Sequence, residues 1–382
     1  MSKPVQHHYL PKNAYLKFFE SSEKADFVWM HQRNKEPIFV NFHNAAKERH
    51  LYSFTDEHGQ YNTELESALA EMESVASKIF EKLNRAEGSI TISAQEKSEL
   101  SYFLAMQTAR TPAFRDSLKQ RAAEFVKLHM QMLASNKNAF NNVLREVKKE
   151  KPHMPDVSFE EMKKFIFDEK YTIKMGNENY FLKQAIQLGD HIYPSIMTKD
   201  MFILKSKSVE LITSDYPVNL IPDPGMPAFY GGGFFMSGIL VPIGTHTALF
   251  CKNPSDSKEP PKRDEQISMG YKEVPFAHAR WINKVTINYA ERFLFSASLN
   301  LKIKELFDKT TVPKRFHMSS PFSHKNEQLL KLNPKKNGEA RKKRGGGKNR
   351  AGGAKKETEE VSVSAILRLA ELRKQKIFHF LF

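Results

Sequence analysis

Four side chains in this sequence are the candidates for acid–base or metal-assisted chemistry. Asp215 directly follows the apolar run at residues 210–213, where a strand end can hold a carboxylate rigidly. Glu66 and Glu73 lie seven residues apart, so on a helix they share one face. Asp215 with Glu66 or Glu73 would bind a divalent metal such as Mg²⁺ or Mn²⁺, or serve as general base, and His8 would transfer protons. The sequence alone leaves the metal and any other cofactor unknown.

A second set of polar residues stands at a strand end or on predicted helix faces that should be apolar: Gln107, Arg110, Ser214, Asn288 and Arg292. Buried polar groups cost roughly 1–3 kcal/mol each unless they are paired. Such a set therefore indicates either an internal network or a polar pocket. In a pocket the two arginines would hold a phosphate, and the other three would complete the ligand site.

Each of these residues also has a structural interpretation, which is the commoner one for any single residue. Asp215 before Tyr-Pro can form a turn, and Arg110 can cap its own helix. Gln107 and Asn288 can bridge helices, and His8 can stack among neighbouring aromatic side chains. The pocket requires all five to converge in space, whereas the structural interpretation lets them scatter.

The known catalytic signatures are absent. The sequence contains no HExxH, no GxSxG, no GxGxxG after a strand and no kinase motif set. Residues 345–349 resemble a phosphate-binding loop, but Asn349 stands where Ser or Thr binds magnesium. Cys251 is the only cysteine, which excludes a disulfide framework or a CxxC pair within one chain.

Positive charge is concentrated near the C-terminus. The formal net charge is +15, and residues 335–356 contain ten basic residues and one acidic residue. Such segments bind polyanions through counterion release, so nucleic acid is the predicted partner of Lys335–Lys356. No apolar run approaches the roughly 20 residues that span a bilayer, and residues 1–10 lack a signal-peptide core. We expect a cytoplasmic protein without a membrane span, of unknown oligomeric state.

Apolar periodicity places most predicted helices before most predicted strands. Capping-box patterns at Thr63 and Ser93, each with Glu three residues on, mark two helix starts. Helices are predicted at 63–83 and 93–111, and a further helical stretch follows and runs to about residue 150. Three more are predicted at 159–170, 178–197 and 276–307. A hairpin is predicted at 27–30 and 37–42, and short strands at 201–204, 209–213, 238–242 and 247–251.

These elements predict an α+β fold, a mainly helical domain with a small antiparallel β-sheet, over residues 1–310. Residues 311–334 are expected to form an irregular linker. Residues 335–356 would be a disordered basic linker, because they contain too little apolar surface to order themselves. Residues 357–382 are expected to end the chain as a short amphipathic helix.

Several motifs, in order along residues 6–300, resemble one known family. They are HYxPxxYL from His8, KERHLY from Lys47, QTARTPxxR from Gln107, TSDYPV from Thr213 and NxAxRF from Asn288. Together they resemble the family called domain of unknown function 4238, in which Tyr216 would replace the more usual Asn of TSDNPV. The resemblance implies a soluble, mainly bacterial protein without an assigned reaction, and an association with antiphage defence.

Two functions are consistent with these features. The first is an antiviral effector that acts on nucleic acid, as a metal-dependent nuclease or another hydrolase. The second is a non-enzymatic sensor or interaction protein whose pocket binds a small anionic ligand or a partner protein. The sequence leaves both open.

Overall fold

The chain forms two compact units in the computed structural model. One contains residues 1–119 and 176–316, and the other contains residues 120–175 and 317–382. The structure describes residues 6–49, 51, 54–55, 61–62, 64–150, 152–153, 157–168, 171–176, 178–222, 233–254 and 259–311. The linkers and terminal helix predicted after residue 311, and the predicted cap Thr63, lie outside the described residues.

A six-stranded sheet forms the centre of the first unit, in the order β10–β11–β12–β8–β13–β7. Its strands are β7 (Ile90–Ser93), β8 (Asp200–Ser206), β10 (Asn219–Ile221), β11 (Gly238–Gly244), β12 (Thr247–Lys252) and β13 (Gln266–Val274). All neighbours are antiparallel except β8 and β13, which run parallel. The predicted α+β class is confirmed, but this sheet is larger than predicted and mixed rather than antiparallel.

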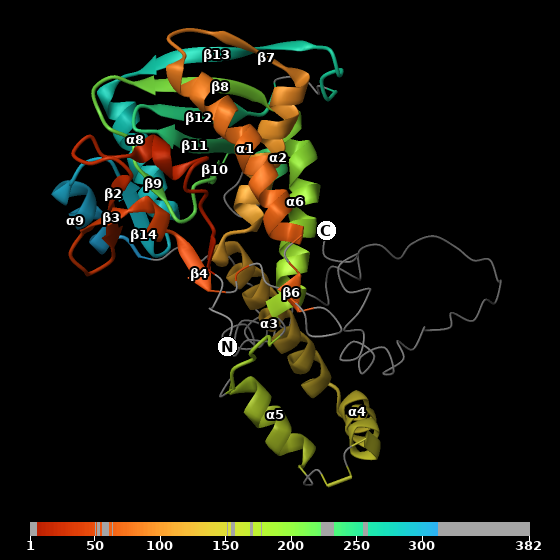
Figure 1. The fold of residues 1–382 in the computed structure, drawn as a ribbon. Helices are drawn as coiled ribbons and strands as arrows, with labels where there is room; N and C mark the ends of the chain where they lie inside the picture. The colour runs from red at the N-terminus through yellow and green to blue at the C-terminus, as the bar shows by residue number, and fades with distance from the viewer. Residues whose placement is uncertain are drawn as a thin grey trace, which may run out of the picture. The chain divides into compact units, whose positions relative to one another are not determined.

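Helices α1 (Glu64–Arg85), α2 (Ala94–Ala109) and α6 (Glu178–Met197) pack with this sheet in the first unit (Figure 1). The predicted capping box is confirmed at the start of α2, where Ser93 and Glu96 exchange hydrogen bonds. Buried apolar side chains of α1 and α2, such as Phe80 and Phe103, join Ile203 and Val241 of the sheet in one core cluster. This core fixes the helix faces that carry the predicted site residues.

A four-stranded antiparallel sheet lies in the same unit, in the order β3–β2–β14–β9. Its strands are β2 (Phe27–Gln32), β3 (Ile38–Asn41), β9 (Thr213–Ser214) and β14 (Phe293–Ser296). The predicted hairpin is confirmed, with Phe27 opposite Asn41. Among the described residues, two short ribbons also pair, β1 (Gln6–His8) with β4 (Lys47–Arg49), and β5 (Phe54–Thr55) with β6 (Tyr61–Asn62).

The long helix predicted at 276–307 is wrong. The chain forms α8 (Phe276–Tyr289), then β14, then α9 (Leu301–Lys309). Apolar spacing across 281–299 imitates a helical repeat, but β14 gains two antiparallel partners, β2 and β9. Pairing on both edges outweighs weak local helix preference. Remaining short elements are the 3₁₀ turns η1 (Leu16–Phe19) and η2 (Phe42–Asn44), and α7 (Gly233–Met236).

The second unit contains helices α4 (Lys137–Glu150) and α5 (Phe159–Phe167) and the later part of α3 (Pro112–Ala134). The helix predicted to run on to about residue 150 is broken after Ala134, where the side chain of Asn136 accepts a hydrogen bond from the Ala139 amide. Asn at such a position satisfies an otherwise unpaired donor of a new helix. The rings of Phe140 and Phe159 pack edge to face, with centroids 5.4 Å apart, and join α4 to α5.

Within the described residues, no helix combines the length and apolar character needed to cross a membrane.

The buried His31 of β2 predicts a pH-dependent stability. Its side chain is 0% exposed, its Nε2 lies 2.9 Å from Ser296 Oγ, and burial lowers its pKa from 6.5 to about 4. The unfolded chain therefore binds a proton more readily, so this contribution is complete above pH 6.5 and is lost as pH falls toward 4. Between pH 7 and pH 5 we expect the wild type to lose about 2 kcal/mol more stability than His31→Gln.

Urea unfolding of wild type and His31→Gln at both pH values measures this difference. Parallel pH dependence of the two proteins would show that His31 titrates normally in the fold.

Candidate functional site

Tyr9 is the residue on which the separate sequence motifs converge. It directly follows β1, and its side chain is 1% exposed. Its amide donates to the Ala46 carbonyl at 2.9 Å, and its own carbonyl accepts from Gln107 Nε2 at 2.9 Å. Burial raises the pKa of its phenol well above the ordinary value, and the Asp215 carboxylate acts in the same direction. Tyr9 thus links the N-terminal segment to the end of α2.

Arg110 and Gln107 form a buried polar frame beneath this segment. Arg110 Nε donates to Gln107 Oε1 at 2.9 Å, Nη2 donates to the same oxygen, and Nη1 donates to Glu73 Oε1 at 2.5 Å. All three guanidinium nitrogens are therefore engaged within the fold, and Arg110 is 1% exposed. The predicted ligand residues Gln107 and Arg110 are brought together, and their contacts hold Glu73 of α1 and Tyr9 in place.

Asp215 joins two distant parts of the chain. Its Oδ1 accepts from the Glu291 amide at 2.9 Å, and its Oδ2 accepts from the amides of Arg292 and Phe293 at 2.7 and 3.2 Å. Burial raises the pKa of this carboxyl to about 6, and the amide donors and Arg292 oppose that rise. Asp215 thereby fixes the backbone at the start of β14, and this backbone carries the side chain of Arg292.

Ser214 shapes the turn that presents Asp215. Its hydroxyl donates to the Tyr216 carbonyl at 2.9 Å and accepts from the Tyr216 amide at 3.1 Å. This is a local side-chain turn of the kind Ser forms readily. The turn motif TSDYPV therefore acts by positioning the residues around it.

Arg292 and Arg115 flank one carboxylate, Glu48 of β4. Arg292 Nη2 lies 3.7 Å from Glu48 Oε2, and Arg115 Nη2 lies 3.6 Å from Glu48 Oε1. The Arg292 guanidinium carbon lies 5.8 Å from the centre of the Tyr9 ring, and its side chain is 48% exposed. Tyr9, Glu48, Arg115 and Arg292 are called the Tyr9 cluster below.

The ion pairs of the Tyr9 cluster are loose. Both distances exceed the 2.7–2.9 Å typical of a charge-assisted hydrogen bond, and Glu48 Oε2 is buried without a hydrogen-bond donor in the described part of the chain. Two guanidinium groups thus share one weakly held carboxylate. Glu48 and Arg115 were not singled out from the sequence as site residues, although both lie inside the motifs KERHLY and QTARTPxxR.

Three predicted site residues lie in other surroundings. Glu66 Oε2 lies 3.4 Å from His7 Nε2. Burial lowers the pKa of His8 to about 4, and the nearby charge of Lys12 adds to the effect. Asn288 is exposed on α8, and so is Trp281, at 43%.

The buried amide of α8 is Asn283, which sequence reasoning missed. It donates to the Glu210 carbonyl at 2.8 Å and accepts from the Ile212 amide at 3.1 Å. The buried residues of α8 are Ala279, Ile282, Asn283, Thr286 and Ile287. The predicted seam through Trp281 and Asn288 is therefore wrong, because the helix turns a different face to the core.

The carboxylates predicted to bind metal each serve a different contact. Asp215 accepts from backbone amides, Glu73 pairs with Arg110 and Glu66 pairs with His7. Among the residues that the structure describes, no three His, Cys, Asp or Glu side chains gather as a metal site. The chemistry that the arrangement offers is recognition of an anion by two arginines beside a tyrosine.

Comparison with known proteins supplies a family. No curated protein and no solved structure matches the chain. A family model described as "Protein of unknown function (DUF4238)" matches residues 6–299, a stretch that contains every member of the Tyr9 cluster. The chain belongs to this family.

Proposed function

We propose that the chain recognises a phosphate group of a nucleic acid through Arg292 and Arg115. The observation that carries the proposal is the shared carboxylate: two guanidinium groups from motifs far apart in the sequence both lie within 4 Å of Glu48. Guanidinium groups bind carboxylate and phosphate in the same planar, two-pronged manner. Glu48 therefore occupies the position that a ligand phosphate would take.

The loose geometry favours exchange of Glu48 for a ligand. Both ion-pair distances are longer than a charge-assisted hydrogen bond, so a phosphate that bonds both arginines directly would displace only weak contacts. Arg292 is half exposed and accessible from solvent, whereas Arg110 is buried and hydrogen-bonded to Gln107 and Glu73. This refines the phosphate site predicted from the sequence, with Arg115 in the place of Arg110.

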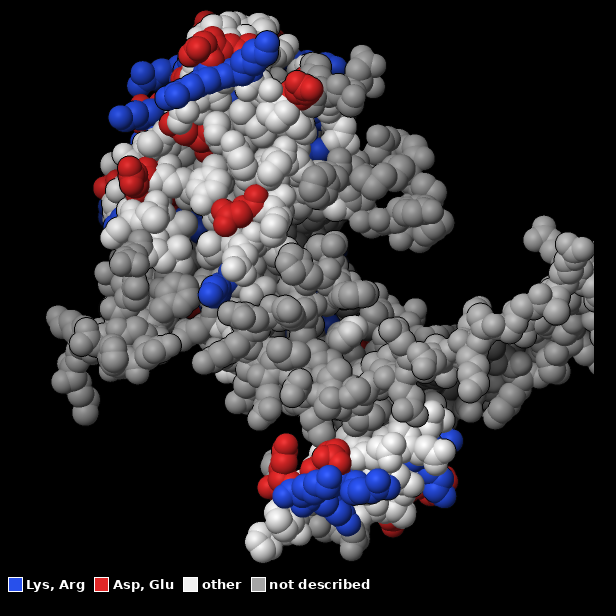
Figure 2. All heavy atoms as spheres, turned by 90° about the vertical axis from the view of Figure 1, so that its right-hand side faces the viewer, with Lys and Arg blue, Asp and Glu red and all other residues white. Residues whose placement is uncertain are grey.

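The ligand class follows from charge. The chain has a net charge of +15, of which a large part lies in Lys335–Lys356, and a basic protein attracts nucleic acid by counterion release. On the described part of the face in Figure 2, basic and acidic side chains are interspersed rather than gathered in one broad basic field. On such a surface, a local arginine site that contacts a phosphate would fix the position of the protein on the nucleic acid.

Binding, rather than hydrolysis, is the activity that the described contacts favour. The residues predicted as catalytic, His8, Glu66, Glu73 and Asp215, contact separate parts of the fold, as described above. In a role in antiphage defence, the protein would act by engaging nucleic acid. Loss of phage protection together with loss of binding in one variant would connect the two.

The test compares two arginines that carry the same charge. We expect Arg292→Met to weaken binding of a fluorescein-labelled RNA or DNA oligonucleotide by about tenfold, and to lower the slope of log K against log salt by about 1. Arg280→Met is the matched control, because Arg280 is exposed on α8 and stacks near Phe276 outside the Tyr9 cluster.

Fluorescence anisotropy at several salt concentrations measures both variants. An equal, small loss in both would mean that only net charge matters and that the Tyr9 cluster is no binding site.

A further inference from the structure

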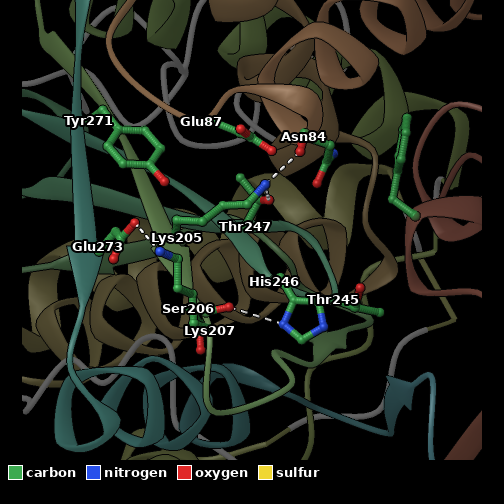
Figure 3. Close-up of a pocket in the computed structure, with 11 residues that line it drawn as sticks. Asn84, Glu87, Lys205, Ser206, Lys207, Thr245, His246, Thr247, Tyr271 and Glu273 are labelled. Carbon is green, nitrogen blue, oxygen red and sulfur yellow. Dashed lines mark hydrogen bonds and ion pairs between the residues drawn. The ribbon is translucent and has the colours of Figure 1, made fainter.

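A polar pocket of about 710 Å³ opens at one end of the six-stranded sheet, and its lining shares no residue with the Tyr9 cluster. It is lined by residues that follow or end α1, β8 and β13, and by the turn between β11 and β12 (Figure 3). Ligand pockets commonly have volumes of roughly 300–1,000 Å³ and combine apolar walls with a few fixed polar groups. The pocket therefore has the size of a small-molecule site.

His246 lines this pocket and carries a hydrogen-bond acceptor. Its Nδ1 lies 3.0 Å from the Ser206 carbonyl, as Figure 3 shows. A carbonyl oxygen can only accept, so the hydrogen of the neutral ring is on Nδ1. The other nitrogen, Nε2, then carries a lone pair, and a ligand N–H can donate to it.

Lys205 presents a donor. Its Nζ donates to the Asn84 carbonyl at 2.5 Å and to Thr247 Oγ1 at 3.1 Å. An ammonium group has three hydrogens, so one remains for a ligand oxygen. Burial lowers the pKa of Lys205, and Glu87 opposes that change. A ligand carbonyl at this place would accept a hydrogen bond from the ammonium group, which the surrounding protein partly shields from water.

Opposite charges balance around the pocket. Lys207 Nζ pairs with Glu273 Oε1 at 2.5 Å, and Glu87 faces the charge of Lys205. A balanced lining offers no net attraction to a free phosphate or carboxylate. It suits a ligand without formal charge whose edge carries both donors and acceptors.

Aromatic side chains supply the apolar part. Tyr271 and Phe18 both line the pocket. Rings of this kind stack on flat heterocycles. Stacking surfaces beside alternating donors and acceptors are what a nucleobase requires.

We propose that this pocket binds a nucleoside, with the base against Tyr271 and its polar edge between His246 Nε2 and the Lys205 ammonium. The proposal goes beyond phosphate recognition at the Tyr9 cluster and does not depend on it. A site for a free nucleoside gives the protein a small-molecule ligand in addition to its proposed nucleic-acid ligand.

Isothermal titration calorimetry of the full chain with adenosine, guanosine, cytidine and uridine tests the proposal, with inorganic phosphate and acetate as separate titrants. We expect at least one nucleoside to bind, and His246→Ala and Tyr271→Ala each to weaken that binding by about tenfold. Arg280→Met should change it less than twofold. Thermal midpoints equal to that of wild type establish that the variants fold.

Three results would overturn the proposal. The first is no heat with any nucleoside. The second is nucleoside binding that His246→Ala and Tyr271→Ala leave unchanged. The third is binding of phosphate or acetate that these two variants abolish, which would make the pocket an anion site. None of these results bears on Arg292, so failure here is distinct from failure of the proposed function.

Discussion

Replacing Arg110 with methionine is expected to destabilise the fold by about 3–5 kcal/mol, the cost of breaking one side of a buried ion pair. Arg110 is 1% exposed, and its guanidinium group bonds Gln107 and Glu73. Methionine fills similar space but leaves both partners without their donor. Gln107, which donates to the Tyr9 carbonyl, also loses its contact with Arg110. We therefore expect the N-terminal segment to unfold first.

Two further variants separate charge from geometry. Arg110→Lys keeps the charge but cannot bond Gln107 and Glu73 together through a planar fork, so we expect an intermediate loss. Glu73→Gln keeps an acceptor for Nη1, and because Glu73 is one-quarter exposed its loss should be the smallest. Urea midpoints of the three variants give the order. A loss under about 1 kcal/mol for Arg110→Met would mean that the frame does not hold the fold.

Replacing Asp215 with asparagine is expected to cost about 2–3 kcal/mol and also to weaken nucleic-acid binding. Three backbone amides donate to this carboxylate. An asparagine side chain retains one oxygen and turns an NH₂ group toward one of these donors, which leaves that buried N–H unpaired. Because the amides belong to Glu291–Phe293, the backbone that carries Arg292 should shift.

Ser214→Ala is the matched control, because it removes two neutral hydrogen bonds from the neighbouring residue. We expect it to cost about 1 kcal/mol and to leave binding nearly unchanged. Urea unfolding and anisotropy measure the two effects. Asp215→Asn with full stability and normal binding, but without some catalytic activity of the wild type, would instead restore the predicted role of Asp215 as a base.

Part of the fold could be predicted because local signals coincide with the final structure. Ser93 with Glu96 marks the start of α2, and the apolar spacing of 178–197 coincides with α6. β13 was not predicted, because its parallel pairing with β8 joins segments distant in the sequence. Gly270 of β13 reflects this pairing, since a side chain there would collide with the ring of Phe202.

Some residues of the candidate site could be singled out for the same physical reason. Gln107, Arg110 and Arg292 stand out as polar residues in apolar patterns. In the fold Gln107 and Arg292 lie beside Tyr9, and Arg110 bonds Gln107. Glu48 and Arg115 do not stand out, because charged residues on short strands and helices usually face solvent. Which of them face each other depends on how β4 and α3 are placed, and no sequence period records that placement.

The central claim is that Arg115 and Arg292 bind one phosphate between them, and a double-mutant cycle tests it most directly. Dissociation constants of the labelled oligonucleotide would be measured for wild type, Arg115→Met, Arg292→Met and the double variant. If both arginines hold the same phosphate, the second substitution should cost much less than the first, with a coupling of at least about 1 kcal/mol. Fully additive losses would contradict the claim, because each arginine would then contact the nucleic acid independently.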